Sequence, residues 1–152
     1  QVLSQAQALS PHRMDVHSLS GQLLLIDDSY NANIDSVTAA LVALKQLAEG
    51  RRKVFVAGQM LELGDTSEQV HTRTAELAHE AGVSDILAIG EAARPLARRA
   101  RELGIATTYV DDADQALAMI DQIVTDFDAV LVKGSHSSGA WRIADYLKEV
   151  RA

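Results

Sequence analysis

The sequence has no cysteine among its 152 residues, which excludes a disulfide framework and a zinc site built from thiolates. The lack of cysteine fits a reducing compartment. No apolar run is long enough to cross a membrane, and no charged-then-apolar signal segment stands at the start. We therefore expect a cytoplasmic protein that does not insert into a membrane.

Two common phosphate-binding motifs are also missing. The sequence has no P-loop of the form GxxxxGK followed by Ser or Thr, and no GxGxxG follows a predicted strand. Alone, the chain is not expected to hold a triphosphate or a dinucleotide in either standard way. Of the five histidines, His71 and His79 share a predicted helix but lie two turns apart, and no pair has the spacing of metal ligands. We predict no metal site.

The chain also lacks an excess of basic residues. It has 14 Lys and Arg against 21 Asp and Glu, a formal net charge of −7. Nucleic-acid-binding domains usually carry a basic stripe. The longest basic segment, residues 94–104, has helical spacing and is interpreted as the solvated face of a helix. We expect no nucleic-acid partner.

What the sequence does contain is a regular alternation of short apolar runs and longer amphipathic segments, in a chain whose length fits one domain. Strands are predicted at residues 14–19, 22–27, 53–58, 85–90, 106–110 and 128–134, and helices at about 37–47, 67–81, 91–103, 112–124 and 140–150. This order predicts a three-layer αβα, Rossmann-like fold with a mostly parallel sheet. The first two strands should form an antiparallel hairpin at its N-terminal edge.

Ligands of such sheets bind beyond the carboxyl ends of the strands. Three of the turns at that edge are unusually polar or rich in glycine: "DDSYNAN" (27–33), "GQMLELGD" (58–65) and "KGSHSSG" (133–139). We expect any functional site to be built from these turns.

The first turn has more polar residues than a helix start needs. Asn33 or Asp35 is expected to cap the following helix. A carboxylate at a strand end can accept hydrogen bonds from ribose hydroxyls, and amides such as Asn31 can serve either a phosphate or an amine. Function and capping both remain open for this turn.

The other two turns also have two interpretations. Ser137 or Ser138 can cap the last helix, while Lys133, beside backbone amides and hydroxyls, can form a cradle for a phosphate or a carboxylate. In "GQMLELGD" the simplest interpretation is that the apolar side chains pack and that Glu62 faces water.

Together these segments resemble a known family. "PHRMDV … LLLIDDSYNAN", "GQMLELGD … H" and "LVKGS" are similar to the C-terminal domain of the Mur ligases, above all of the members that add a dipeptide. The resemblance implies a lead-in from a preceding domain at residues 1–10 and the Mur ligase C-terminal domain at 11–152. It implies the same Rossmann-like αβα fold.

The resemblance also implies an activity. These bacterial enzymes use ATP to join D-alanyl-D-alanine to UDP-N-acetylmuramoyl-tripeptide in peptidoglycan precursor synthesis. In these enzymes ATP and Mg²⁺ are bound mainly by the N-terminal and central domains. Those two domains would be the partners of this chain. The isolated domain is therefore expected to be inactive, and no catalytic residue is assigned within it.

Site residues follow from the same resemblance. ATP-binding positions correspond to Arg13, Asp28, Tyr30, Asn31 and Asn33, with Asp28 on the ribose. Positions that contact the incoming dipeptide correspond to Lys133, Ser135, Ser138 and Gln59. Two positions depart from the usual family sequence, since Ile34 replaces a proline and Gln59 an aspartate. Two alternatives remain: another amide ligase, such as one that adds glutamate to folate, or a stand-alone binding module without catalysis.

Overall fold

The computed structural model describes residues 12–152, so the predicted lead-in at residues 1–10 lies outside the described part. Within it, one sheet has the strand order β1-β2-β6-β3-β4-β5. The strands are β1 (Asp15–Leu19), β2 (Leu23–Asp28), β3 (Lys53–Gly58), β4 (Asp85–Ile89), β5 (Ala106–Val110) and β6 (Ala129–Lys133). Only β1 runs antiparallel, paired with β2 at the edge. The predicted fold class is confirmed.

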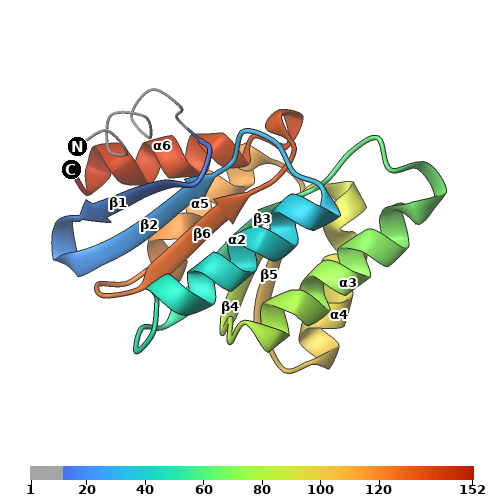
Figure 1. The fold of residues 1–152 in the computed structure, drawn as a ribbon. Helices are drawn as coiled ribbons and strands as arrows, with labels where there is room; N and C mark the ends of the chain where they lie inside the picture. Colours follow the sequence, from blue (N-terminus) through green and yellow to red (C-terminus); the bar gives the residue numbers. More distant parts are fainter. Residues whose placement is uncertain (1–11) are drawn as a thin grey trace.

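Helices cover both faces of the sheet (Figure 1). They are α2 (Ile34–Leu47), α3 (Ser67–Glu80), α4 (Arg94–Glu102), α5 (Ala113–Ile123) and α6 (Ala140–Val150). Buried side chains of α2, α3 and α4 form one hydrophobic cluster with the sheet, and those of α5 and α6 form a second cluster on the opposite face. None of the helices in the described part combines the length and the apolar character needed to cross a bilayer.

Side chains alternate between the two faces because successive strand residues point in opposite directions. In β6, Leu131 packs into the cluster of α2, while Val130 and Val132 pack into that of α6. All five residues of β6 are buried, as expected for a central parallel strand. The same alternation sends the neighbouring Asp27 and Asp28 of β2 to opposite faces. Their carboxylates therefore have different partners, Lys148 and Lys133.

Short 3₁₀ turns precede several helices, and one of them explains a difference from the predicted boundaries. Residues 91–103 were predicted as one helix, but Glu91–Ala93 form the 3₁₀ turn η3, and α4 begins at Arg94 with a proline in its first turn. A proline fits there because the N–H groups in the first turn of a helix have no carbonyl acceptor within the helix. The N–H that proline lacks therefore costs no hydrogen bond. The remaining turns are η1 (Ser20–Gln22), η2 (Gly64–Thr66) and η4 (His136–Ser138).

The order of the strands determines where a ligand can bind. Strand β6 lies between β2 and β3, although it follows both in the chain. The helices that follow β2 and β6, α2 and α6, lie on opposite faces of the sheet (Figure 1). The carboxyl ends of these strands therefore border a topological switch point, where α/β sheets bind ligands.

Candidate functional site

The three polar turns meet at the carboxyl ends of β2, β6 and β3. The ends of β3 and β6 approach so closely that a Cβ atom on Gly134 would lie 2.7 Å from Cα of Gly58. Hydrogen bonds then join the turns: the N–H of Ser135 donates to the carbonyl of Gln59 (3.0 Å), and the N–H of Leu61 donates to Oγ of Ser135 (2.9 Å). The predicted convergence of the turns is confirmed.

Between these turns lies an open cleft of about 760 Å³. Its lining residues come from all three turns: Tyr30, Asn31, Ala32, Asn33, Leu61, Glu62, Leu63, Ser135, His136 and Ser137. Figure 1 shows the three turns along one edge, beyond the arrowheads of β2, β3 and β6. The cleft combines amides, hydroxyls and apolar side chains, which is typical of a site for a small polar molecule.

Lys133 is buried and bound to Asp28. Its side chain is 2% exposed, and its ammonium group lies 2.8 Å from Oδ2 of Asp28. It also donates to the carbonyls of Asn31 (2.9 Å) and Asp28 (3.3 Å). An ammonium group has three donors, and these partners occupy all of them. Lys133 therefore holds the first turn and does not line the cleft.

Asp28 keeps some access to solvent. Its side chain is 14% exposed, and Oδ1 accepts a hydrogen bond from the N–H of Met14 (2.9 Å). An ionised carboxylate offers about four acceptor positions, so the two bonds from Lys133 and Met14 leave capacity for a further donor. Nearby, the guanidinium of Arg13 lies 4.0 Å from the centre of the Tyr30 ring. The geometry thus groups Arg13, Asp28 and Tyr30 beside the cleft.

The two asparagines of the turn line the cleft, and each also accepts a hydrogen bond from a backbone N–H. Asn33 caps α2: Oδ1 accepts from the N–H of Ser36 (2.8 Å), and the Ser36 hydroxyl accepts from the N–H of Asn33. The predicted capping role of Asn33 is confirmed. This reciprocal box secures the helix start without the proline that Ile34 replaces. Oδ1 of Asn31 accepts from the N–H of Ala32.

Of the predicted dipeptide residues, only Ser135 lines the cleft. The Ser138 hydroxyl donates to the carbonyl of Ser135 (2.6 Å) and accepts from the N–H of Ala140 (3.2 Å), the first residue of α6. The Gln59 side chain turns toward η3, where Oε1 accepts from the N–H of Ala92 (2.9 Å). Gln59 borders a second, more open cleft together with Asp65, Glu68 and Glu91, among others.

His71 is fully buried and holds the turn after β3. Its Nε2 accepts from the N–H of Met60 (3.0 Å), and its Nδ1 donates to the carbonyl of Ser67 (2.8 Å). Both bonds require the neutral ring. Burial lowers the pKa of His71, and the bond to Ser67 offsets this only in part. The sequence did not show that this histidine holds a turn of the site.

We expect this histidine to make stability depend on pH. Its pKa is lower in the folded chain than the ordinary value of about 6.5, so its contribution is complete above pH 6.5 and declines as the pH falls below it. The decline is at most about 1.4 kcal/mol per pH unit. Urea unfolding of the native chain and His71→Gln at pH 7.5, 6.5 and 5.5 checks this, because Gln can accept the Met60 bond without titrating. Parallel pH profiles of the two proteins would contradict it.

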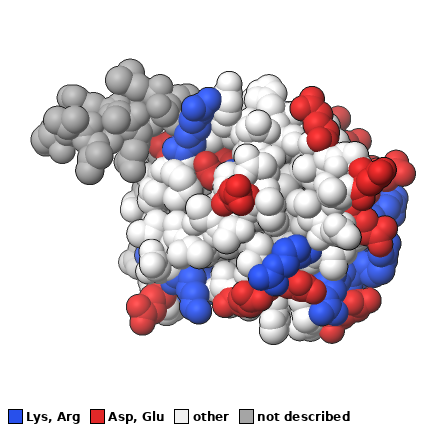
Figure 2. All heavy atoms as spheres, turned by 45° about the vertical axis from the view of Figure 1, so that its right-hand side comes forward, with Lys and Arg blue, Asp and Glu red and all other residues white. Residues whose placement is uncertain are grey.

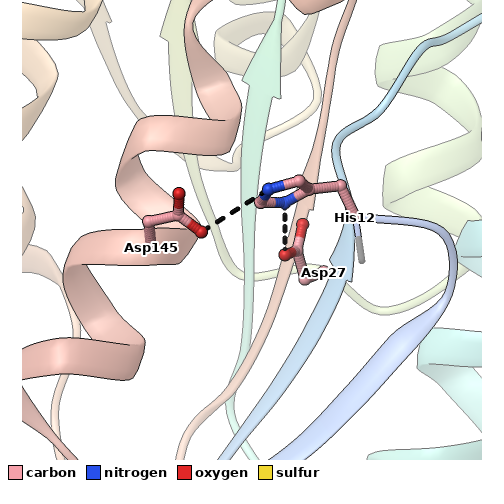
Figure 3. Close-up of side chains that lie close together, drawn as sticks. All are labelled: His12, Asp27 and Asp145. Carbon is pink, nitrogen blue, oxygen red and sulfur yellow. Dashed lines mark hydrogen bonds and ion pairs between the residues drawn. The ribbon is translucent and has the colours of Figure 1, made fainter. Parts of the chain in front are cut away.

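A second cluster lies on the opposite face of the sheet. Nδ1 of His12 lies 2.6 Å from Oδ2 of Asp27, and Nε2 lies 3.5 Å from Oδ1 of Asp145 (Figure 3). Asp27 comes from β2 and Asp145 from α6, and the three ligand atoms lie within 4.8 Å of one another. Sequence spacing gave no sign of this group, because its members are far apart in the chain.

The cluster already contains a cation. Nζ of Lys148 lies 2.6 Å from the Asp27 oxygen that also faces His12, and 3.3 Å from Oδ2 of Asp15. Burial would lower the pKa of Lys148, but the hydrogen bond to Asp27 and the charges of Asp27 and Asp15 outweigh it and raise the pKa. An ammonium group at this oxygen repels a metal ion. The cluster instead attaches His12, and with it the neighbouring Arg13, to β2 and α6.

The fold and the cleft define the class of the molecule: an α/β ligand-binding domain with its site at a topological switch point. The particular family follows from comparison with known proteins. The family model for the "Mur ligase, glutamate ligase domain" matches residues 12–136. The chain belongs to the Mur ligase family.

Known proteins match this chain in sequence, and solved structures match it in fold. The UDP-N-acetylmuramoyl-tripeptide–D-alanyl-D-alanine ligase of Mycobacterium leprae is 36% identical over 91% of this chain and 30% of its own length. A crystal structure of MurF from Acinetobacter baumannii matches with a TM-score of 0.80 and 27% identity, covering 92% of this chain and 31% of that one. MurF from Thermotoga maritima in complex with ADP shares the fold, with a TM-score of 0.70, 24% identity and coverage of 91% and 31%. The chain thus spans 30–31% of the length of these relatives.

Proposed function

We propose that this chain is the C-terminal domain of an ATP-dependent ligase that joins D-alanyl-D-alanine to UDP-N-acetylmuramoyl-tripeptide. The reaction would belong to peptidoglycan precursor synthesis in the bacterial cytoplasm. Its partners would be the N-terminal and central domains of the same protein. The name of the Mycobacterium leprae relative supports this substrate pair.

One structural observation carries the proposal. The turns that hold the family motifs, after β2, β3 and β6, line a single open cleft at the topological switch point. Such a cleft can receive a small substrate, but it has no P-loop to hold a triphosphate. This combination fits a domain that completes a nucleotide site on a neighbouring domain.

Asp28 and Arg13 are the groups we assign to ATP. The Asp28 carboxylate has capacity to accept a ribose hydroxyl, and the Arg13 guanidinium, stacked on Tyr30, can approach a phosphate. Asn31 and Asn33 line the cleft, where their amides would lie toward the phosphates and the incoming amine. Lys133 would act as a positioning residue, because its ammonium group is bound to Asp28 and two carbonyls.

Mg²⁺ does not fit the described residues as well as ATP does. His12, Asp27 and Asp145 lie close enough to share an ion, but the Lys148 ammonium contacts the same Asp27 oxygen. Magnesium also prefers an all-oxygen octahedral shell. We therefore assign the metal to the central domain, where it would stabilise the charge that develops on the transferred phosphoryl group.

The charge of the surface is consistent with a small-molecule substrate. The face shown in Figure 2 is largely white, with some acidic side chains near its centre and with acidic and basic side chains mixed toward the lower and right-hand edges. Over the described residues of this face, no continuous basic stripe is seen. Nucleic-acid binding, which needs such a stripe, is not part of the proposal.

A panel of amine substrates tests the proposal. The full-length protein would be given ATP, Mg²⁺, UDP-N-acetylmuramoyl-tripeptide and, one at a time, D-alanyl-D-alanine, D-alanine, L-alanine and D-glutamate. We expect ADP release and a ligated product by mass spectrometry only with the dipeptide. Preferred use of a single amino acid would instead support another amide ligase, and glutamate addition to folate in a parallel assay would support the folate-type alternative.

A further inference from the structure

We propose that the cleft binds the incoming dipeptide by its two charged ends, with His136 on the carboxylate and Glu62 on the ammonium group. This inference rests on the proposed function, because it takes a dipeptide as the substrate. It assigns substrate contacts to two residues outside the predicted site. It also replaces Lys133 as the cation that faces the substrate carboxylate.

The charged groups of the cleft lead to this assignment. Among the residues that line it, all within the described part of the chain, His136 is the only one that can carry a positive charge and Glu62 the only one that carries a negative charge. They come from different turns, after β6 and after β3. A zwitterion needs one group of each sign, and an extended dipeptide spans about 7 Å between its ends.

Lys133, the nearest other cation of this loop, is not free to bind a substrate. Its side chain is 2% exposed, and all three of its donors are bound to Asp28 or to backbone carbonyls. Moving it to the cleft would leave the Asp28 carboxylate without its cation. His136, three residues further along, is exposed and lines the cleft directly.

The ring of His136 is held in place by aromatic neighbours. It stacks on Trp141 of α6, with 5.5 Å between ring centres and 14° between planes. Tyr30, on the opposite turn, meets it edge to face at 6.5 Å. The stack with Trp141 leaves the edge of the imidazole ring, which carries its two nitrogens, available to a carboxylate. The stack also limits the orientations of His136, which lowers the entropy lost on binding.

The backbone of Glu62 is strained. Its φ angle is +63°, in the left-handed region that glycine or asparagine adopts more readily than a residue such as glutamate. Strain of this kind concentrates at binding sites, where the surrounding structure maintains it. Glu62 is exposed and forms no ion pair among the described residues.

The cleft also suits small apolar side chains. Leu61 and Leu63 flank Glu62 and line the cleft, and Leu61 is 40% exposed. Ala32 contributes a further methyl group on the opposite turn. Contacts of this kind would cover the methyl groups of two alanines, while the charged ends reach His136 and Glu62.

The test of His136 uses the full-length enzyme and two substrates, D-alanyl-D-alanine and its C-terminal amide, which lacks the carboxylate. We expect His136→Gln to raise KM for the dipeptide about tenfold, the loss of one charge-assisted hydrogen bond, with little change in kcat. KM for the amide should stay within about twofold. His136→Arg, which restores a cation, should recover most of the affinity for the dipeptide.

Glu62 is tested with N-acetyl-D-alanyl-D-alanine, a dipeptide analogue without the ammonium group that is added as a competitor of the dipeptide. Glu62→Gln should raise KM for the dipeptide about tenfold and leave inhibition by the acetylated compound unchanged. Glu62→Gly should weaken the dipeptide equally while the midpoint of thermal unfolding is kept or raised, because glycine relieves the positive φ. This variant separates binding from folding.

Two results would overturn the inference. If His136→Gln changes KM equally for the dipeptide and its amide, His136 does not bind the carboxylate, even though the enzyme ligates the dipeptide. If the native enzyme ligates no dipeptide with ATP, the proposed function fails and the inference fails with it. The native enzyme's activity therefore distinguishes the two failures.

Discussion

Replacing Lys133 with methionine is expected to lower the free energy of unfolding of the chain by about 3 kcal/mol, the effect of breaking a buried ion pair from one side. The side chains of Lys133 and Asp28 are 2% and 14% exposed, and their charged atoms lie 2.8 Å apart. Methionine fills a similar volume but leaves Oδ2 of Asp28 without its cation and the Asn31 carbonyl without the Lys133 donor. Urea unfolding at neutral pH measures the loss.

A double substitution sharpens this prediction. Asp28→Asn removes the carboxylate that Lys133→Met leaves uncompensated, so the double variant should be more stable than the sum of the single effects predicts. Lys45→Met on the exposed side of α2 serves as the control and should change stability by no more than about 0.5 kcal/mol. A similarly small loss of stability for Lys133→Met would mean that the ion pair between its ammonium group and Asp28 contributes little to the fold. The original assignment of Lys133 to the dipeptide would then be favoured.

Asp28→Asn in the full-length enzyme is expected to raise KM for ATP by about 10- to 100-fold, which corresponds to the loss of a hydrogen bond to a charged group. KM for the dipeptide should change far less, because Asp28 does not line the cleft between the three turns. Steady-state kinetics with each substrate varied in turn measures both values.

Deoxynucleotides identify the group that Asp28 binds. The native enzyme should prefer ATP to 2′-deoxy-ATP or 3′-deoxy-ATP, and Asp28→Asn should lose that preference. Asp111→Asn is the matched control, because Asp111 is an exposed carboxylate just after β5 at the same edge of the sheet. If Asp28→Asn discriminates against both deoxynucleotides as strongly as the native enzyme does, Asp28 does not contact the ribose.

The sequence was sufficient to predict the fold because each of its signals is local. Apolar runs of about five residues that alternate with longer amphipathic segments favour strands of a buried sheet, because the runs are too short for helices. Asn33 before α2 is a cap whose geometry involves only the next three residues. The convergence of the three turns also followed, since parallel strands end at the same edge.

The directions of individual side chains could not be predicted in the same way. Asp27 and Asp28 are neighbours in the sequence, but the alternation of β2 sends one toward Lys148 of α6 and the other toward Lys133 of β6. These partners are more than 100 residues away in the chain. Pairing at such distances depends on the register of the sheet, which the sequence alone does not give.

The same reason explains the residues that were placed differently or missed. The side-chain oxygen of Gln59 accepts a hydrogen bond from the N–H of Ala92. The two residues are close only because β3 and β4 are adjacent in the sheet. The ring of His136 stacks on Trp141, the second residue of α6, and this contact exists only in the folded chain. Glu62 was expected simply to face water, and its positive φ is a property of the folded turn.

The central claim is that these residues form one part of a site that other domains complete. The most direct measurement compares ADP release and product mass for the full-length protein and for residues 12–152 alone, each with ATP, Mg²⁺, UDP-N-acetylmuramoyl-tripeptide and D-alanyl-D-alanine. The account predicts ligation by the full-length protein and none by residues 12–152. Ligation by residues 12–152 alone, or its absence from the full-length protein, would contradict it.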